Sequence, residues 1–307
     1  MGGFLAVKAR KVLPLLMLVI VLALSAIVWF YPPTGNFSVD NPFWNGLSAY
    51  SSVAKVVPLD SYVNLPSSGK GTALIVIPYE QFTENELAQL KSYVLSGGTL
   101  VLMDNYGFGN QVLGGLGLGM RFTGQPLLDP LFDYRNEWFP EITDFSNSSV
   151  NRNVSSIVFD HATCLNDTSG ATVIAESSSF SFLDVNENGV WDAGEPTGPL
   201  PMAAYVMMGQ GCVVAVANPG LLINGMINMD NNLQFIGNVV SIKGSSPKVF
   251  VDQFHLPETS LDEGKAFLAV VYGVVASPLG TLSLIVVVLA LLLTPIWKRR
   301  ESHDEKR

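Results

Sequence analysis

The chain has 307 residues, of which 48% are hydrophobic and only 14% are charged, and its mean hydropathy is +0.34. This composition excludes intrinsic disorder and differs from that of ordinary soluble domains, in which about 25% of residues are charged. The net charge of −9 excludes nucleic acid as the main partner, because phosphate binding requires clustered lysines and arginines. Three histidines and two cysteines are too few for most zinc or iron–sulfur sites.

Two uncharged apolar segments, residues 12–31 and 279–297, account for the high hydropathy. At 1.5 Å per residue, a helix of this length spans the hydrocarbon core of a bilayer, which is about 30 Å thick. Basic residues precede the first segment and follow the second, so the positive-inside rule predicts two cytoplasmic ends and an exported middle. These basic residues are Lys8, Arg10, Lys11, Lys298, Arg299 and Arg300.

These segments predict a two-pass protein of the cell membrane, with bilayer lipid as a direct partner. A signal peptide cleaved near Ser25 is the alternative for the first segment, but the apolar run continues to Tyr31, which favours an uncleaved anchor. The expected parts are a cytoplasmic N-terminus (1–11), a first transmembrane helix (12–31), an extracytoplasmic α/β domain (32–265), a membrane-proximal segment with the second transmembrane helix (266–297) and a cytoplasmic tail (298–307).

The exported part is acidic. Between the two apolar segments there are 9 Lys and Arg residues against 23 Asp and Glu residues, a net charge of −14. Such a surface attracts divalent cations and repels acidic polymers. Four Asn-x-Ser/Thr sequences predict glycosylation, three of them in a Ser- and Asn-rich region that we expect to be an exposed loop. Their asparagines are Asn36, Asn147, Asn153 and Asn166.

The first half of the exported part predicts a βαβ unit. After a short amphipathic helix at 45–55, residues 72–78 form a continuous apolar run of strand length, typical of a strand covered on both faces. Thr83 and Glu86 have the spacing of a capping box, which opens a helix that ends at two consecutive glycines. Residues 99–103 then form a second buried strand, parallel to the first.

The second half predicts further strands and one helical region. The alternation of strands and helices predicts an α/β fold with a doubly wound, mostly parallel sheet and an antiparallel or mixed portion after residue 150. The later strands are expected at 156–159, 171–175, 179–183, 203–207, 212–217 and 248–252, and the helical region, in two pieces, at 221–242.

Residues 184–195 fit the calcium-loop pattern D-x-[DN]-x-[DN]-G-x5-E at every position. Oxygens at positions 1, 3, 5, 7, 9 and 12 of such a loop converge on one ion, and the glycine at position 6 allows the sharp turn. A strand before the loop and prolines after it predict a strand-flanked structural calcium site rather than an EF-hand; the alternative is an acidic hairpin loop. The predicted ligands are Asp184, Asn186, Asn188, Val190 through its carbonyl, Asp192 and Glu195.

A second candidate site is the loop at residues 104–110, directly after the strand at 99–103. In open α/β sheets, ligands bind outside the carboxyl ends of the strands, and glycines allow a ligand to approach the backbone closely. The alternative is a strand-to-helix turn capped by Asp104 or Asn110. The predicted ligand-binding residues are Asp104, Asn105, Gly107, Gly109 and Asn110, together with Arg121 and Asp129 further along the chain.

Two other pairs have structural interpretations. Arg121 and Asp129 are expected to form an ion pair that fixes an irregular segment, and contact with a ligand is the alternative. Asp252 and His255 are interpreted as surface groups at a strand end, with a metal pair as the alternative.

The two cysteines leave two alternatives open. Cys164 and Cys212 form a disulfide, which would stabilise the exported domain by roughly 4 kcal/mol in the chain-entropy model, or Cys212 is a plain core residue of a buried strand. His161 lies three residues before Cys164, but this spacing does not establish a catalytic dyad.

Several stretches resemble an uncharacterised family of archaeal membrane proteins. In that family a glutamine-amidotransferase-like, flavodoxin-like domain is held outside the cell between two spans, and the resemblance covers most of residues 36–255. It implies a class I amidotransferase-like sheet, whose enzymes carry a cysteine nucleophile at a turn after a strand. The counterpart here is the turn at 104–110, which has no cysteine, so the resemblance implies a catalytically inactive domain. The stretches are ALIVIPYEQFTENELAQLKSYVLSGGTLVLMDNYGFGN, LGLGMRF, PLLDPLF, DVNENGVWDAGEPTGP and VVAVANPGLLINGMINMDNN.

The sequence therefore predicts a non-enzymatic, calcium-stabilised binding or scaffold module at the cell surface, whose partners include other cell-surface or membrane proteins. One alternative is a hydrolase of surface glycans or peptides that uses carboxylates such as Asp104, Asp129 or Asp160; its catalytic pair would face one cleft, about 5–9 Å apart. Another is an auxiliary subunit of a membrane transport complex, by analogy with relatives of the fold.

Overall fold

The computed structural model describes residues 2–146, 148–244 and 246–304, without the side chains of 2–12, 15, 149, 291–292 and 295–304. The chain divides into two units. Residues 32–257 form an α/β unit, and the two terminal segments form a helical unit. The α/β unit ends before the predicted boundary at 265, because a capping box formed by Thr259 and Asp262 already begins a helix.

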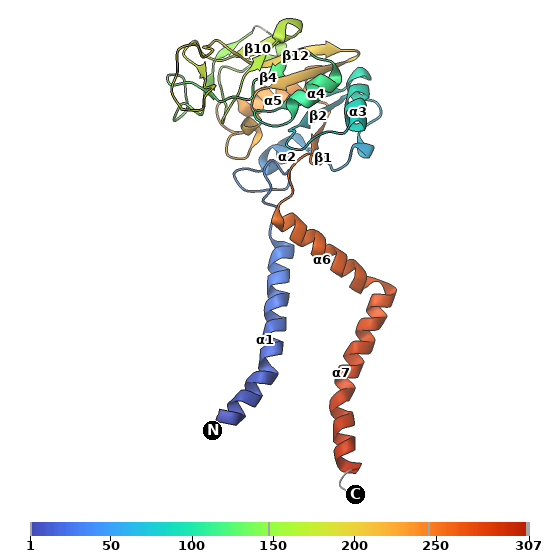
Figure 1. Cartoon of the computed structure of the whole chain (residues 1–307). Coiled ribbons are helices and arrows are strands. Elements are labelled where there is room, and N and C mark those ends of the chain that lie inside the picture. The colour runs from blue at the N-terminus through green and yellow to red at the C-terminus, as the bar shows by residue number, and fades with distance from the viewer. Residues whose placement is uncertain (1, 147, 245, 305–307) are drawn as a thin grey trace. The chain divides into compact units, whose positions relative to one another are not determined.

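The α/β unit is built on an eight-stranded mixed sheet (Figure 1). The first five strands in the sheet order are parallel, and the last three continue it antiparallel. Two of these three, β10 and β12, lie after residue 150 as predicted, whereas β7 lies before it. The order is β1 (Val57–Leu59), β14 (Lys248–Asp252), β2 (Thr72–Val76), β3 (Thr99–Met103), β13 (Gly211–Val216), β12 (Pro201–Met208), β10 (Thr172–Glu176) and β7 (Asp144–Phe145).

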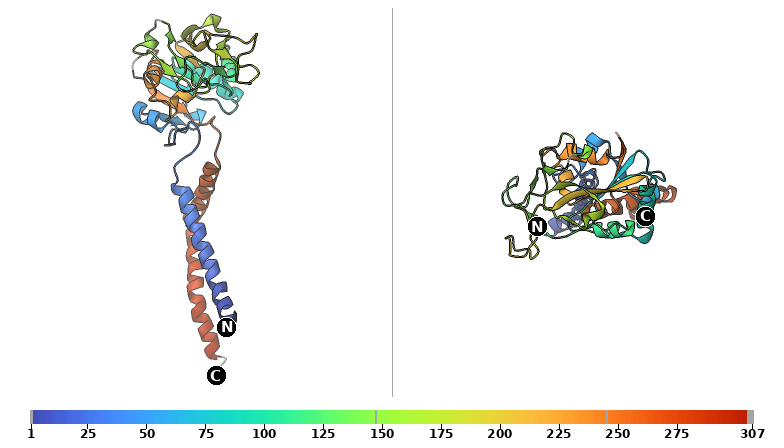
Figure 2. Two further views of the ribbon diagram at one scale, coloured as in Figure 1. Left: turned by 90° about the vertical axis from the view of Figure 1, so that its left-hand side faces the viewer. Right: turned by 90° about the horizontal axis from the view of Figure 1, so that it is seen from above.

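Helices cover both faces of this sheet (Figure 2). On one face, α3 (Glu84–Leu95) and α4 (Gly109–Leu116) pack on β2, β3 and β13. On the other face, α2 (Ser48–Ala54) and α5 (Asn232–Val240) belong to a second core cluster. The strands between them are buried on both faces, which explains why they appear in the sequence as continuous apolar runs.

The predicted βαβ unit is confirmed. β2 and β3 are parallel neighbours, and α3 connects them. The capping box is also present: Thr83 Oγ1 accepts from the Glu86 backbone, and Glu86 Oε2 accepts from Thr83 N at 2.7 Å.

Short pairs of strands and 3-10 turns fill the long connection between α4 and β13. The pairs are β4 (Arg121–Phe122) with β9 (Leu165–Asn166), β5 (Leu127–Leu128) with β11 (Phe182–Leu183), and β6 (Glu141–Ile142) with β8 (Ile157–Val158). The 3-10 turns of the unit are η1 (Tyr62–Asn64), η2 (Ser149–Asn151), η3 (Thr168–Gly170) and η4 (Gly220–Leu222).

The first and last segments of the α/β unit are joined by one side chain. Gln253 follows β14, and its amide accepts from Val39 N at 2.9 Å and donates to the Phe37 carbonyl at 3.3 Å. The chain therefore enters and leaves this unit at one place.

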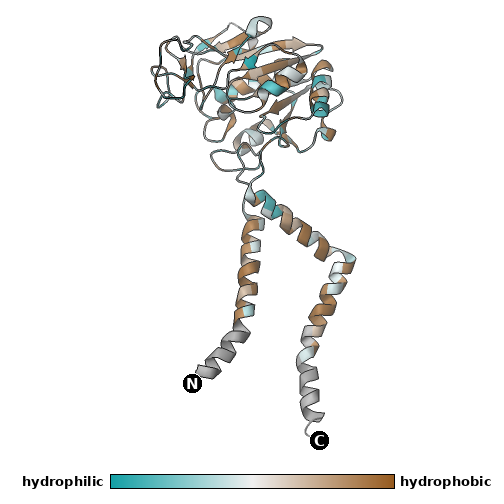
Figure 3. Ribbon diagram, viewed as in Figure 1, coloured by the Kyte–Doolittle hydropathy of each residue, from teal (hydrophilic) through white to brown (hydrophobic). Residues whose placement is uncertain are grey.

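The helical unit consists of α1 (Gly2–Phe30), α6 (Ser260–Ala276) and α7 (Pro278–Asp304). Figure 3 shows the apolar character of their described parts and the polar start of α6. Among the described residues no single helix has the length and hydropathy of a membrane span. The pair Ser260–Ala276 and Pro278–Ala290, bent by 77°, has them together, and Leu16–Phe30 is a shorter apolar helix. The basic side chains that set the predicted orientation lie outside the described residues.

Candidate functional site

β3 and β13 are neighbouring parallel strands, and the chain that follows their carboxyl ends turns to opposite faces of the sheet. After β3 it continues into α4 on one face, and after β13 it continues through η4 toward α5 on the other. Such a switch point opens a crevice at the carboxyl edge of an α/β sheet, and this is where ligands bind in such folds. We call the residues that follow β3 (104–110) and β13 (217–220), together with residues 160–161, which hydrogen bond to both segments, the edge site.

Asp104 follows β3 and holds the turn at the edge site. Its side chain is 4% exposed, and its two oxygens accept from the backbone nitrogens of Gly107 at 2.8 Å and Gly109 at 2.7 Å. A Cβ at Gly107 would approach the Pro78 carbonyl oxygen to 2.4 Å, so the turn requires glycine there. Burial raises the pKa of Asp104 to about 6, although the backbone hydrogen bonds act in the opposite direction.

The two asparagines of the predicted ligand loop also hydrogen bond within the domain. Asn110 pairs with the backbone of Phe122 in both directions, at 2.8 Å each, and so fastens α4 to β4. Asn105 donates to the His161 carbonyl at 3.1 Å. Tyr106 between them is 46% exposed. The polar groups of 104–110 thus shape the loop, and their contact with a ligand stays a prediction.

The structure adds an Asp–His pair to the edge site. Asp160 Oδ1 lies 2.5 Å from His161 Nδ1, and the backbone carbonyl of Asp160 accepts from the Asn218 amide at the end of β13. The His161 ring is exposed, and it packs against Trp138 with 5.1 Å between ring centroids. His161 has a φ of +53°, a conformation that is uncommon for a residue with a side chain and often marks functional positions.

The carboxylates of Asp104 and Asp160 both act electrostatically on Tyr79. Burial raises the pKa of Tyr79 to about 12, and the charges of Asp104 and Asp160 contribute. From the sequence, Asp160 is predicted only as one of several candidate hydrolase carboxylates, and His161 only as a neighbour of Cys164. The sequence signal for this pair was an Asp followed directly by a His at the end of the strand predicted at 156–159.

Arg121 and Asp129 do not pair, so the predicted ion pair is wrong. The Arg121 guanidinium donates to the carbonyls of Leu118 and Met120 at 2.5 and 2.7 Å, within its own loop. Asp129 is fully buried, and its oxygens accept from the backbone of residues 131 and 132 and from Ser178 Oγ at 2.5 Å. The hydrogen bonds of Arg121 are thus made within its own loop, and those of Asp129 are made with the nearby backbone and with Ser178.

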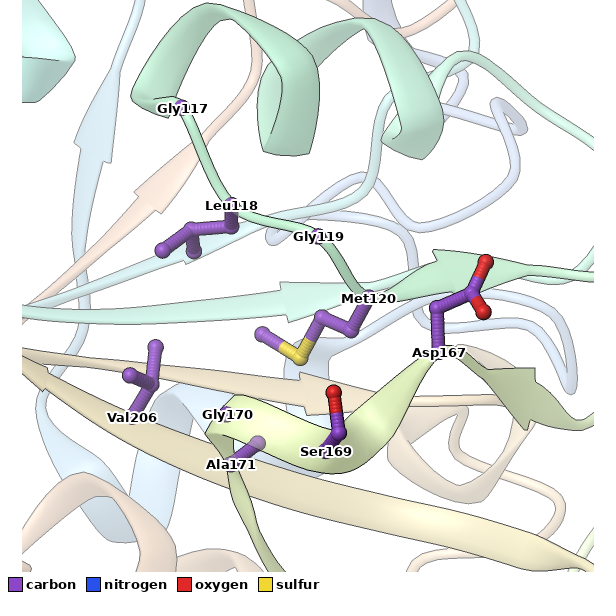
Figure 4. Close-up of a pocket in the computed structure, with 9 residues that line it drawn as sticks. All are labelled: Gly117, Leu118, Gly119, Met120, Asp167, Ser169, Gly170, Ala171 and Val206. Atoms are coloured by element: carbon purple, nitrogen blue, oxygen red, sulfur yellow. The ribbon is translucent and has the colours of Figure 1, made fainter.

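A pocket of about 230 Å³ lies beside this loop (Figure 4). Leu118, Met120 and Val206 form its apolar part, whereas polar side chains come only from Asp167 and Ser169. None of the predicted ligand-binding residues lines it.

The predicted calcium loop is flanked by extended segments, as expected: Leu183 of β11 donates to the Pro196 carbonyl at 2.9 Å. Asp184 is fully buried, and its carboxylate accepts from the backbone of Asn188 at 3.1 Å and of Gly189 at 2.8 Å. Gly189 has a φ of +80°, which the turn at this position requires.

The other predicted ligands face one another across the loop. Glu195 accepts from the backbone of Val185 at 2.8 Å and of Asp192 at 2.9 Å. The amides of Asn186 and Asn188 donate to Asp192 Oδ2 at 2.8 and 2.7 Å, and these bonds lower the pKa of Asp192. In the part of the chain that the structure describes, no three Asp, Glu, His or Cys side chains are grouped closely enough to hold a metal. A calcium ion here would therefore depend on amide and backbone oxygens as well, as the sequence pattern implies.

Cys164 and Cys212 are buried free cysteines, so the predicted disulfide is absent and the core-residue alternative holds for Cys212. Thr163, next to Cys164, donates to the Ala217 carbonyl. Cys212 lies at the opposite end of β13, and at about 3.3 Å per residue this separation is roughly 16 Å. A disulfide requires Cα atoms within about 7 Å. Burial raises the pKa of both thiols, to about 12 at Cys212, which makes them poor nucleophiles.

Asp252 and His255 are buried, which corrects their interpretation as surface groups. His255 Nδ1 lies 2.7 Å from Asp252 Oδ2, which also accepts from the Tyr62 hydroxyl at 2.9 Å. The His255 ring stacks on Phe82 with 3.6 Å between centroids. His255 Nε2 is 3.7 Å from Glu86. The pair thus joins β14 to η1 and α3 inside the domain.

Three of the predicted glycosylation sites, Asn36, Asn153 and Asn166, are exposed. Asn147 lies outside the described residues. Their glycosylation stays a prediction.

Residues 39–240 match the model of a family described as a domain of unknown function, DUF4350. The chain belongs to this family. The family match confirms part of the expected resemblance over residues 36–255, namely membership of an uncharacterised family, DUF4350. The predicted α/β fold with a mostly parallel mixed sheet is also confirmed. No curated protein matches this DUF4350 sequence.

Solved structures give distant likenesses to this DUF4350 chain. The mmIFT52 N-terminal domain is 16% identical with a TM-score of 0.49, covering 64% of this chain and 88% of that one. Cytoplasmic protein STM1381 from Salmonella typhimurium LT2 is 14% identical with a TM-score of 0.40, covering 64% and 80%. A beta-galactosidase from Bacillus circulans sp. alkalophilus is 15% identical with a TM-score of 0.35, covering 57% of this chain and 23% of that one. None of these likenesses indicates what this chain binds.

Proposed function

We propose that this chain is a membrane-anchored, extracytoplasmic binding module without catalytic activity, which contacts a cell-surface ligand or partner through the edge site. The apolar helices at both chain ends and the acidic middle support its placement. The exposed Tyr106 and His161 side chains, with Trp138 and Asp160 beside them, provide the contact surface. Such a mixture of rings and hydrogen-bonding groups is typical of recognition sites.

The observation that carries the proposal is that both side-chain oxygens of Asp104 are buried and bonded to the backbone of its own turn. A catalytic carboxylate must reach a substrate atom, and the two oxygens of Asp104 instead accept from the backbone of the turn, away from solvent. Asp129 is likewise fully buried, with both oxygens bonded. The turn after β3 therefore supports a binding surface rather than a nucleophile or a general acid.

The binding role predicts a ligand-dependent rise in the melting temperature of the full chain in detergent. A panel of soluble polysaccharides and peptides is the probe. At least one member should stabilise the wild type, and Tyr106→Ala or His161→Ala should abolish the shift, because each removes an exposed ring of the edge site. Met207→Ala is the control, since Met207 is exposed and lies beside Cys212 at the opposite end of β13. A panel without any shift, or equal shifts in the three variants, would contradict the proposal.

The anchored topology predicts one-sided labelling. A membrane-impermeant maleimide added to intact cells should label Val63→Cys, at an exposed position of the α/β unit, but not Ser302→Cys in the predicted cytoplasmic tail. The two native cysteines are buried and add little background. Labelling of Ser302→Cys before lysis, or protection of Val63→Cys, would exclude this orientation.

The calcium loop predicts a calcium-dependent gain in stability. With a Kd of about 10⁻⁴–10⁻³ M, calcium at ~10–100 times Kd should stabilise the α/β unit by about 1–3 kcal/mol, seen as a rise in melting temperature. Asp184→Ala and Glu195→Ala should remove this rise. Glu187→Gln, at a loop position that provides no ligand, should keep it. If calcium does not raise the melting temperature of the wild-type chain, the proposed calcium site is wrong.

Calcium would also act on the edge site. Burial raises the pKa of Tyr106 to about 12, and the charges of Glu187, Asp160 and Tyr79 contribute, so Glu187 of the predicted calcium loop acts electrostatically on the edge site. A rigid loop would then fix one side of the binding surface.

A hydrolase is the second candidate, favoured by the Asp160–His161 pair. A carboxylate that orients a histidine is a common general-base arrangement. Turnover of any glycan or peptide in the same panel, lost in His161→Ala, would replace the binding proposal with this one.

A further inference from the structure

Three loops of the α/β unit bring large apolar side chains together at the surface. Phe132 and Phe180 stack with 6.0 Å between ring centroids, and Phe180 lines a pocket of about 450 Å³ together with Val190 and Trp191. Single exposed apolar residues are common, but a contiguous group of them marks an interaction site. We call this group, whose side chains are between 43% and 63% exposed, the apolar loop surface; its members are Leu131, Phe132, Phe180, Val190 and Trp191.

A buried carboxylate holds two of these loops in place. Asp129 is fully buried, and its Oδ1 accepts from the backbone nitrogens of Leu131 at 3.1 Å and Phe132 at 2.9 Å. Its Oδ2 accepts from the Ser178 hydroxyl at 2.5 Å, and the oxygen of that hydroxyl accepts from Phe180 N at 3.0 Å. The backbone beneath these exposed side chains is therefore fixed before a partner arrives, which lowers the entropic cost of binding.

The apolar loop surface is larger than its pocket. Phe180, Val190 and Trp191 belong to the wall of the pocket, whereas Leu131 and Phe132 lie outside that wall. A small molecule confined to the pocket would leave these two side chains in water. A peptide segment can fill the pocket with one large side chain and cover the rest of the surface with its neighbours, which is a common mode of recognition.

The loops that form this surface are strongly acidic. Residues 129–139 and 178–197 contain 7 Asp and Glu residues against one basic residue, Arg135, a net charge of −6. Glu137 lines the pocket, and among the described residues its carboxylate has no hydrogen-bond or ion-pair partner. A calcium ion in the predicted loop would still leave a net charge of −4. Such a field attracts basic partners and repels acidic ones.

The charge also separates the possible occupants. Two copies of this surface would bring like charges together, and the headgroups of an anionic bilayer would be repelled in the same way. We propose that the apolar loop surface binds a basic segment of a partner protein, which places one large apolar side chain in the pocket and Lys or Arg side chains beside the acidic loops. This second interaction surface shares no residue with the edge site.

The test selects peptides from a phage-displayed library of random dodecapeptides against the full chain in phosphatidylcholine nanodiscs, with empty nanodiscs used to remove lipid binders. Enriched peptides should carry a large apolar residue flanked by Lys or Arg. Trp191→Ala and Phe180→Ala should each weaken binding of a selected peptide, measured by fluorescence anisotropy, by about tenfold or more. Glu137→Gln should weaken it about threefold and reduce its dependence on salt. Trp44→Ala is the matched control and should leave the affinity unchanged, because Trp44 is exposed but does not line this pocket.

The same variants separate binding from folding, because truncation of an exposed side chain should leave the melting temperature unchanged. If no peptide is enriched, if the enriched peptides have no excess of Lys and Arg, or if Trp191→Ala keeps full affinity, the proposal is wrong. Self-association of the chain in nanodiscs that is lost in Trp191→Ala would assign the surface to a second copy instead. A peptide that His161→Ala releases and Trp191→Ala retains would belong to the edge site, and this result would also overturn the proposal.

Discussion

Replacement of Asn232 with alanine is expected to destabilise the α/β unit by about 3–5 kcal/mol. The Asn232 side chain is fully buried; its amide donates to the carbonyls of Val158 at 3.0 Å and Met226 at 2.9 Å, and its oxygen accepts from Val158 N at 2.9 Å. Alanine leaves the buried N–H and carbonyl of Val158 without the Asn232 partner, at about 1–3 kcal/mol each. It also removes one of the two bonds to the Met226 carbonyl, which still accepts from Met229 N at 2.8 Å. Urea unfolding of the full chain in detergent, followed by tryptophan fluorescence, measures the loss.

Gln234→Ala is the matched control for this prediction, because Gln234 is exposed on the same helix and bonds only to Asn238. Its substitution should change the free energy of unfolding by less than about 0.5 kcal/mol. A loss below about 1 kcal/mol in Asn232→Ala would mean that water or local rearrangement replaces all three bonds.

The second large effect is a dependence of stability on pH that comes from Asp104. Its pKa is about 6 in the folded chain against 3.8 for the ordinary group, so between these values the folded state binds a proton that the unfolded state has lost. The stabilisation from this proton is complete below pH 3.8 and is lost as the pH rises through 6. At about 1.36 kcal/mol per pKa unit, the loss is about 3 kcal/mol.

Asp104→Asn should remove this pH dependence. The difference in unfolding free energy between variant and wild type, measured by urea titration at intervals from pH 4 to pH 8, should therefore shift by about 2.5 kcal/mol in favour of the variant as the pH rises. Asp60→Asn replaces an exposed carboxyl and is the control for the general effect of charge. A difference that stays constant over this range would show that Asp104 titrates alike in both states.

Local patterns predicted the elements that position the edge site. The apolar runs of β2 and β3 and the capping box of Thr83 and Glu86 depend on neighbours in the sequence, and each appears as predicted. The flanking strand and the turn of the predicted calcium loop follow from an equally local spacing. Such features need no knowledge of the tertiary fold.

The polar partners that were mispredicted depend on contacts between distant parts of the chain. Asp129 is satisfied by Ser178, 49 residues away, and Asp252 by Tyr62, 190 residues away. A buried carboxylate and an exposed one look alike in sequence, because only the fold decides which groups leave water. The Asp160–His161 pair is adjacent in sequence, yet its place above β13 follows from the hydrogen bond to Asn218.

The amide of Gln253 fastens the beginning of the α/β unit to its end. A pull on either terminal helix is therefore transmitted to the other at this point, before it reaches the strands. In the membrane-anchored arrangement proposed above, a force applied through the two ends of the α/β unit would load these two hydrogen bonds before it loads the sheet.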